Sequence, residues 1–242
     1  MKKFYIILLL GILFSAHIKA QQFKSDEPFA HTFSIVAIDT AAGEMAVAVQ
    51  SHWFSVGSIV SWGKSGVGVV ATQSFVNPAY GTEGLKLMAD GKSASEALQL
   101  LTKQDEGRDY RQVAFIDHKG DIATHTGNKC VQSASHITGD NFSVQANMML
   151  NDNVVPAMAK TFTENKNLPL PERIIETLKA AQNAGGDIRG KQSAVLLVFD
   201  IKPVDQEWKD KKINLRVDDH SEPIAELERL LKVHRAYEHM NN

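Results

Sequence analysis

The stretch "HTFSIVAIDTAAGEMAVAVQSH", residues 31–52, decides the fold class. Two apolar segments, Thr32–Asp39 and Glu44–Ser51, flank the short turn sequence "TAAG". Two such segments around a glycine-containing turn predict a β-hairpin. Threonine opens the first strand, eleven residues beyond the start of the predicted exported chain at Gln21. The sequence therefore raises the question of whether Thr32 is an ordinary strand residue or a nucleophile.

The first twenty residues have the composition of a signal peptide. Two lysines precede an apolar run, residues 4–14, and Ala20 supplies a small residue at the expected cleavage point. The run is shorter than the ~20 residues of a spanning helix, so an uncleaved membrane anchor is the less favoured alternative. We expect an exported protein, periplasmic or secreted, with residues 21–31 as a leader and residues 32–242 as a single domain.

The composition of the whole chain argues against several partners. The 242 residues carry a formal charge of −2, and removal of residues 1–20 with their three lysines leaves −5. This mildly acidic balance gives no electrostatic basis for binding nucleic acid or an anionic membrane. Cys130 is the single cysteine, so packing without an intrachain disulfide must hold the fold.

Strand and helix signals follow each other in blocks. After the first hairpin, residues 58–74 predict a strand pair around a glycine-rich turn. The further predicted elements are helices over 80–91 and 93–103, strands over 111–127 and 142–149, helices over 152–165 and 169–185, strands over 193–200 and 212–219, and a helix over 222–240. Such blocks favour an α+β fold with antiparallel or mixed sheets over a doubly wound fold.

Local signals predict three helix boundaries. Ser93 and Glu96 have the spacing of a capping box at the start of a helix. Asp152 is expected to cap the helix that follows it, and Gly185 with Gly186 is expected to end the next one.

Several motifs with catalytic meaning have structural interpretations that we favour. Residues 66–71 match a relaxed dinucleotide fingerprint, but the segment continues as a strand. Residues 218–220, "DDH", contain metal-ligating types, and an acidic strand exit is the favoured interpretation. Cys130 beside His136 would suit a thiol nucleophile, and a small buried hydrophobe is favoured instead. We expect no metal and no cofactor.

Amide and charged side chains gather at strand ends in three segments. They are Gln73, Ser74, Asn77 and Tyr80 in the first, Gln145 and Asn147 in the second, and Asp187, Arg189, Lys191 and Gln192 in the third. Buried amides require hydrogen-bond partners, so their convergence predicts a polar pocket. Local turn and strand-end hydrogen bonds are an equally good explanation.

Thr32 carries the sharpest chemical hypothesis. The α-amine of an N-terminal threonine has a pKa near ~8 and can accept the hydroxyl proton without a histidine. This chemistry requires cleavage of the chain after His31. Without cleavage, a threonine at the head of a strand is structural, and the residues alone favour that interpretation.

The chain closely resembles the domain of unknown function 1028 family in several long segments. These are residues 32–91, 109–127 with "DYRQVAFIDHKGDIATHTG", 142–149 with "FSVQANMM", 184–198 with "AGGDIRGKQSAVLLV" and 215–231 with "LRVDDHSEPIAELERLL". The family is grouped with the N-terminal nucleophile hydrolases. The resemblance therefore implies a four-layer αββα sandwich and a threonine nucleophile, which here is Thr32. Some longer relatives carry a peptidoglycan-binding module, which we do not expect in this chain.

The first functional hypothesis is an exported hydrolase of amide bonds with Thr32 as nucleophile and its freed amine as base. Asn147, or backbone amides near Ser65 and Gly66, would stabilise the oxyanion. Substrate positioning is assigned to Asn77, Asp187 and Arg189. The supporting lysine of proteasome-like sites has two candidates, Lys64 and Lys191.

The alternative is a non-catalytic member of the same fold that binds a small molecule, a peptide or the cell envelope through the amide-lined pocket. It predicts an intact leader. A homo-oligomer that associates through the outer helices is a further expectation.

Overall fold

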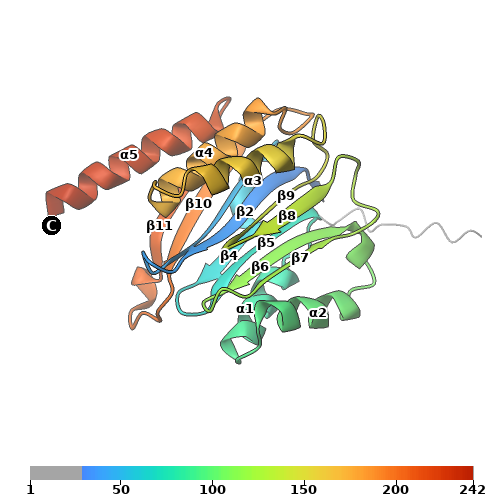
Figure 1. The fold of residues 1–242 in the computed structure, drawn as a ribbon, viewed down its shortest axis with the longest axis horizontal. Helices are drawn as coiled ribbons and strands as arrows, with labels where there is room; N and C mark the ends of the chain where they lie inside the picture. Colours follow the sequence, from blue (N-terminus) through green and yellow to red (C-terminus); the bar gives the residue numbers. More distant parts are fainter. Residues whose placement is uncertain (1–28, 242) are drawn as a thin grey trace, which may run out of the picture.

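The computed structural model describes residues 29–241 (Figure 1). The predicted signal peptide, residues 1–20, and residues 21–28 of the predicted leader lie outside this range. The described part contains five α-helices and two antiparallel sheets, which confirms the predicted α+β class. No helix within residues 29–241 combines the length and the hydropathy that a bilayer crossing requires.

The six-stranded sheet has the strand order β11-β10-β3-β2-β9-β8. Its strands are β2 (Thr32–Asp39), β3 (Glu44–Ser51), β8 (Ser135–Gly139), β9 (Phe142–Ala146), β10 (Ser193–Asp200) and β11 (Lys211–Val217). The predicted hairpin is confirmed, because β2 pairs with β3 from Thr32 opposite Ser51 to Asp39 opposite Glu44. These two strands lie at the centre of the sheet, and all their residues except Asp39 are buried.

The five-stranded sheet is built around β5. Its strands are β1 (Phe29–Ala30), β4 (Ser61–Lys64), β5 (Gly68–Phe75), β6 (Arg111–Asp117) and β7 (Ile122–Thr126). β6 occupies one edge of β5, while β4 and β1 pair with separate parts of β5. The segment 66–71 is a hairpin turn and strand, as predicted. Gly66 has a φ of +75° there, and a Cβ would lie 2.6 Å from the Pro203 nitrogen.

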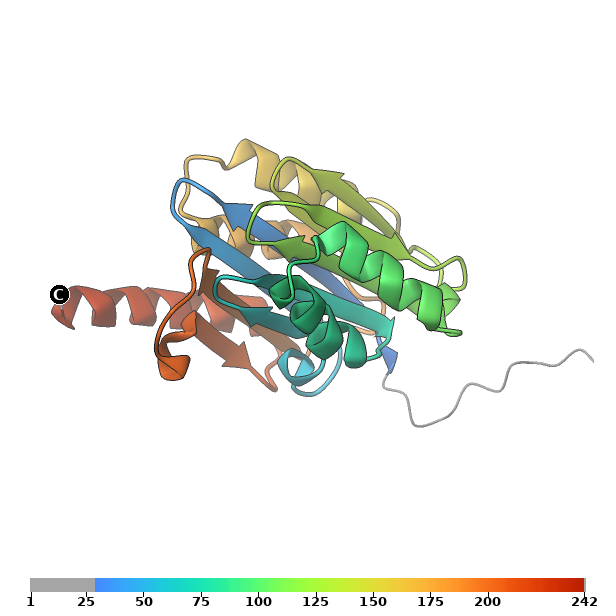
Figure 2. The same cartoon turned by 90° about the horizontal axis from the view of Figure 1, so that it is seen from below.

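Helices cover the outer face of each sheet, and the two sheets face each other (Figures 1 and 2). The helices are α1 (Ala79–Ala89), α2 (Ala94–Gln104), α3 (Val154–Glu164), α4 (Leu170–Asn183) and α5 (Pro223–Asn241), with 3₁₀ turns at Val56–Ser58, Arg108–Tyr110 and Glu207–Lys209. One hydrophobic cluster joins α3, α4 and α5 to the six-stranded sheet, and another joins α1 and α2 to the five-stranded sheet. A third cluster lies between the sheets.

Two strands escaped prediction from the sequence. β8 is an edge strand with the sequence "SHITG", and its side chains are largely exposed. An exposed edge strand needs no apolar alternation, so the pattern gave no signal. β1 has only two residues. It shows that the end of the predicted leader, Phe29 and Ala30, pairs with β5 as part of the sheet.

The predicted helix boundaries are mostly correct. The capping box of Ser93 and Glu96 is present, with both reciprocal hydrogen bonds. Gly186 lies just beyond the end of α4 and has a positive φ, and its amide donates to the Ala181 carbonyl in the last turn of the helix. The Asp152 cap is wrong. α3 begins after Asn153, which makes no side-chain capping bond.

Candidate functional site

Thr32 lies at the start of β2 and faces the space between the two sheets. Side chains alternate along a strand, so Thr32 shares a face with Val36 and Ile38 of the cluster between the sheets. It is fully buried. Its hydroxyl donates to Ser51 Oγ at 3.3 Å, and Ser51 Oγ donates to the carbonyl oxygen of His31 at 2.5 Å. One hydroxyl group therefore contacts both the candidate nucleophile and the carbonyl of the peptide bond before it.

The carbonyl oxygen of Thr32 is held by amide groups. It accepts hydrogen bonds from the Asn147 backbone at 3.1 Å and from Gln73 Nε2 at 3.2 Å, and Asn147 Nδ2 approaches to 3.5 Å. The structure therefore brings Asn147 to Thr32, as the sequence hypothesis requires. The contact is with the carbonyl of Thr32 itself, so Asn147 fixes the position of the residue. Its Oδ1 is buried and has no hydrogen-bond partner among the described residues.

A network of fully buried amides extends from Thr32 across both sheets. Gln73 Nε2 donates to Gln112 Oε1 at 2.7 Å, and Ser34 Oγ donates to Gln73 Oε1 at 2.5 Å. Gln145 Nε2 donates to Ser34 Oγ at 2.6 Å. The amides do converge, as one of the two interpretations predicted. They fill the space with bonds to one another, and none of them lines the cavity described below.

Asp187 and Arg189 lie on the loop before β10 and form an ion pair close to His31. Asp187 Oδ2 accepts from Arg189 Nη2 at 2.9 Å and from the His52 amide at 3.0 Å. The pKa of His31 falls to about 4, chiefly because the ring is buried. The Arg189 guanidinium lowers it further and the Asp187 carboxylate opposes this. Two of the three predicted substrate-positioning residues are thus electrostatic neighbours of the residue that precedes Thr32.

Asn77 is half-buried and forms hydrogen bonds at the start of α1. Its Oδ1 accepts a hydrogen bond from the Ala79 amide at 3.1 Å, and its carbonyl accepts from the Tyr80 amide. This is the geometry of a turn that leads into a helix. None of the hydrogen bonds described for Asn77 runs to Thr32, Asp187 or Arg189.

The turn between β4 and β5 does not contribute an oxyanion hole. The Ser65 amide donates to Asp210 Oδ1 at 2.9 Å and the Gly66 amide donates to the Asp200 carbonyl at 3.0 Å. Thr32 neighbours the opposite end of β5, since Gln73 is the β5 residue that contacts it. The hypothesis that these two amides serve Thr32 is therefore wrong. The turn residue Lys64 is exposed, and Lys191 pairs with Glu222.

The remaining sequence candidates have structural partners. Cys130 Sγ donates to the Arg111 carbonyl at 3.3 Å, and burial raises the pKa of its thiol. His136 Nδ1 contacts Thr126 Oγ1 instead. Asp218 pairs with Arg216 at 2.8 Å. Within residues 29–241, no group of three or more His, Cys, Asp or Glu side chains has the arrangement of a metal site.

The sequence alone did not reveal how the leader enters the site. The Phe29 ring stacks on the Phe75 ring with centroids 4.0 Å apart, and the His31 ring meets the Phe29 ring edge at 3.8 Å. Ala30 is fully buried opposite Ser74 of β5. The last three leader residues thus pack against the end of β5 directly before Thr32.

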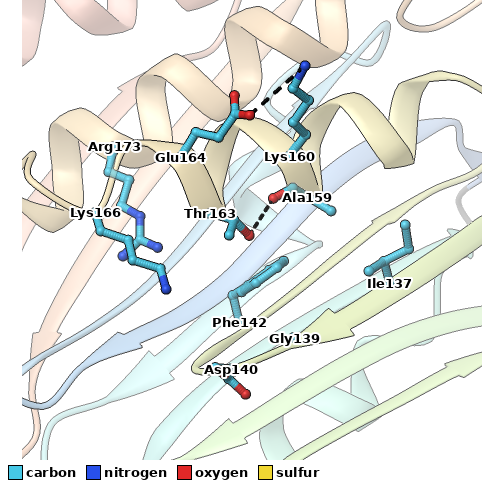
Figure 3. A pocket seen from close by; sticks show the side chains of 10 residues that line it. All are labelled: Ile137, Gly139, Asp140, Phe142, Ala159, Lys160, Thr163, Glu164, Lys166 and Arg173. Atoms are coloured by element: carbon cyan, nitrogen blue, oxygen red, sulfur yellow. Dashed lines mark hydrogen bonds and ion pairs between the residues drawn. The ribbon is translucent and has the colours of Figure 1, made fainter.

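A cavity with a volume of about 480 Å³ lies elsewhere (Figure 3). Its lining residues are Ile137, Gly139, Asp140, Phe142, Ala159, Lys160, Thr163, Glu164, Lys166 and Arg173. Phe142 pairs with Ala37 near the far end of β2 and belongs to the cluster under α3 and α4. The cavity is therefore on the other face of the sheet from Thr32.

Arg173 is the most distinctive group in this cavity. Its Nε donates to the Phe162 carbonyl at 2.6 Å, and its guanidinium lies 3.5 Å from the centre of the Phe162 ring. Burial lowers the pKa of Arg173. Within residues 29–241, no carboxylate lies at ion-pair distance from the guanidinium.

Comparisons with known proteins give a family but no activity. No curated protein matches the chain. A crystal structure of a Silicibacter pomeroyi protein, described as belonging to DUF1028, is similar with a TM-score of 0.74 and 31% sequence identity, over 84% of this chain and 88% of that one. The family model described as a family of unknown function (DUF1028) matches residues 32–227, so the match begins at Thr32. The chain therefore belongs to the DUF1028 family.

Proposed function

We propose that the protein is a latent amide-bond hydrolase of the N-terminal nucleophile class, with Thr32 freed by cleavage of the His31–Thr32 bond. The observation that carries the proposal is the position of Ser51 Oγ, which contacts both the Thr32 hydroxyl and the His31 carbonyl. The family match that starts at Thr32 adds to it. In the intact chain the Thr32 nitrogen belongs to the His31–Thr32 peptide bond. It can therefore act as the base for turnover only after this bond is cleaved.

The packing order supports the finer fold assignment that this class requires. Helices α1 and α2, the five-stranded sheet, the six-stranded sheet and helices α3 to α5 are joined by three successive hydrophobic clusters. We assign this arrangement to the four-layer αββα sandwich of the N-terminal nucleophile hydrolases.

The first step is release of the leader. Thr32 Oγ1 attacks the carbonyl carbon of His31, while the Ser51 hydroxyl donates to the carbonyl oxygen as negative charge develops there. The bond between this carbon and the Thr32 nitrogen breaks, and the hydroxyl proton passes to that nitrogen. Water then hydrolyses the ester, which gives a carboxylate on His31, a free amine on Thr32 and the restored hydroxyl.

Turnover repeats this chemistry on an external amide. The freed amine takes the Thr32 hydroxyl proton as the oxygen attacks the substrate carbonyl. That proton passes to the leaving amine, and water hydrolyses the resulting ester. Asn147 and Gln73 hold the Thr32 carbonyl, so they act as positioning residues and orient the nucleophile.

Export completes the proposal. The basic start, apolar run and small residue of segment 1–20 support secretion to the periplasm or beyond, and cleavage at Ala20 would leave the leader for the second cleavage. Fractionation of the producing cells tests this, because an unprocessed chain retained in the cytoplasm would contradict export.

The decisive experiment is the intact mass and N-terminal sequence of the wild type, Thr32→Ala and Thr32→Ser proteins purified from an exporting host. We expect the wild type to begin at Thr32 and the Ser variant to be cleaved more slowly. The Ala variant should keep its leader and lose about a thousandfold or more of any amide hydrolysis, because it has no nucleophile. Its melting temperature should stay within a few degrees of the wild type. A wild-type chain that stably begins at Gln21, or an Ala variant that is cleaved equally, would overturn the proposal.

One observation favours the alternative of a non-catalytic binding protein. The cavity of Figure 3 is lined by the Arg173 guanidinium and by the apolar side chains of Phe142 and Ile137, a combination that suits a ligand with a carboxylate and an apolar body. Calorimetry with muropeptides and acidic peptides tests it. Binding without product that Arg173→Ala removes, together with an intact leader, would establish the alternative.

A further inference from the structure

We infer that the acyl side of the substrate is an extended peptide that ends, before the scissile amide, in an aromatic residue, a small residue and a neutral polar residue. This inference rests on the proposed function. It takes the leader residues Phe29, Ala30 and His31 as the first substrate of the site, already bound along the edge of β5 that later substrates would use.

The backbone of the leader shows how such a peptide would bind. Phe29 and Ala30 pair antiparallel with Phe75 and Ser74 on β5. β4 pairs with the same edge of β5 only as far as Ala71, so removal of β1 leaves Ser74 and Phe75 without a strand partner on that edge, while β6 pairs with the other edge. An extended peptide can replace β1 there by strand addition, in which main-chain hydrogen bonds give affinity and side-chain sites give specificity.

The aromatic preference comes from the position of Phe29. Its ring stacks on Phe75 at 4.0 Å with an angle of 24° between the planes, and Phe75 in turn meets Tyr110 edge-on at 5.8 Å. Aromatic pairs of this kind contribute about 0.5–1.5 kcal/mol beyond the burial of their area. An aliphatic or polar side chain at this position would lose the stacking.

The preference for a small residue comes from Ala30. Its side chain is fully buried and belongs to the hydrophobic cluster between the sheets. A larger side chain would have to displace packed neighbours, which destabilises a well-packed site.

The neutral polar preference comes from the surroundings of His31. The ring is buried, its centroid lies 3.8 Å from that of the Phe29 ring, and the charges of Arg189 and Asp187 act on it. Its Nδ1 has no hydrogen-bond partner among the described residues, so the site tolerates a polar group without requiring its charge. A lysine or arginine there would be buried beside the Arg189 guanidinium, which disfavours it.

The test begins with leader release from the full-length chain, followed by intact mass in purified protein without added protease. Phe29→Tyr should release the leader at a rate within about twofold of the wild type. Phe29→Ala and Ala30→Leu should each slow release by about tenfold. Trp208→Ala is the matched control, since it removes an aromatic ring that is exposed and far from the leader contacts, and it should not change the rate. Melting temperatures show whether each variant is folded.

The second arm uses the protein that results from its own processing. Three chromogenic anilides, of Phe-Ala-Gln, Ala-Ala-Gln and Phe-Leu-Gln, are compared as substrates. The first should give a kcat/KM about tenfold or more above the other two.

The outcomes separate this inference from the proposed function. If the rate of leader release and kcat/KM for the anilides do not depend on the aromatic and small residues, the inference is overturned and the proposed hydrolase function is retained. No release from the wild-type chain would overturn both. The expected result is slow leader release in Phe29→Ala and nearly wild-type release in Phe29→Tyr. The anilides should show the same preference for an aromatic and a small residue.

Discussion

The space between the two sheets has an apolar half and a polar half, although both are equally buried. Strands β2, β3, β5 and β6 contribute to both, and the face of each that is apolar at one end becomes polar at the other. The apolar half contains Val36, Ile38, Val47, Val69, Ala71, Ala114, Ile116 and Phe199, and the polar half contains Thr32, Ser34, Ser51, Gln73, Gln112, Gln145 and Asn147. The change occurs within two residues on β2, between Val36 and Ser34.

The two halves are stabilised in physically different ways. Burial of apolar area is non-directional, and side chains of similar volume substitute for one another at modest cost. Buried amides gain little from hydrogen bonds, but they are costly when a partner is lost. The polar half therefore contributes little to the free energy of unfolding, and its main role is to fix the positions of side chains and backbone. It fixes where the Thr32 carbonyl and hydroxyl lie, and this difference can be tested.

The largest expected effect on stability is in the apolar half. Phe199→Ala should lower the free energy of unfolding by about 3–5 kcal/mol in urea titrations, because the ring is fully buried between the sheets. Leader release from the fraction that stays folded should remain within about twofold of the wild type. A large loss of release from folded protein would break the distinction between the halves.

The next effect depends on pH and on the leader. Folded His31 has a pKa of about 4 instead of 6.5, so between these values the unfolded chain binds a proton that the folded chain does not. Stability should therefore fall as the pH is lowered from about 6.5 to 4, by up to about 3 kcal/mol.

The uncleavable Thr32→Ala protein isolates this effect of His31. The loss of stability should be smaller by up to about 3 kcal/mol when His31→Gln is added, because glutamine does not titrate. His136 has a lowered pKa in both proteins, so its contribution cancels in the difference. Equal pH dependence of the two proteins would show that the His31 ring is not buried as a neutral group.

A smaller effect on stability is expected in the polar half. Gln73→Ala removes partners from Ser34, Gln112 and the Thr32 carbonyl, and should cost about 1–3 kcal/mol. Its effect on leader release should be larger, about tenfold, since the Thr32 carbonyl loses one of its anchors. Gln145→Ala is the matched control, because this amide is bonded to Ser34 and does not donate to Thr32. Equal rates for the two variants would remove the positioning role of Gln73.

The fold was predictable wherever a residue pattern had to satisfy a buried environment. The strands of the first hairpin and the helix capping box were correct because apolar spacing and local hydrogen bonds decide them. β8 was missed because an exposed edge imposes no pattern on its residues. The role of β1 was missed because two residues pair with a strand more than forty positions away, and no local signal records this.

The site was predictable in composition and only partly in arrangement. The amides at positions 73, 145 and 147 were singled out because such groups are uncommon in apolar strands, but Gln112 was overlooked because it follows the charged Arg111 at the start of a strand. Ser51 was also missed. Its contact with both sides of the His31–Thr32 bond follows from the pairing of β2 with β3, which fixes the register but not the side-chain rotamers.

The smallest expected effect on stability is at Asn77, which belongs to neither half of the space between the sheets. Its side chain accepts a hydrogen bond from Ala79 at the start of α1, so Asn77→Ala should cost about 1 kcal/mol, and Asn77→Asp, which keeps the acceptor, should cost less. Leader release and anilide hydrolysis should not change in either variant, because the bond is local to the turn. A raised KM for Asn77→Ala with unchanged stability would instead restore the substrate-positioning role that the sequence suggested. The substrate contacts along β5 would then have to extend past Phe75 to the start of α1.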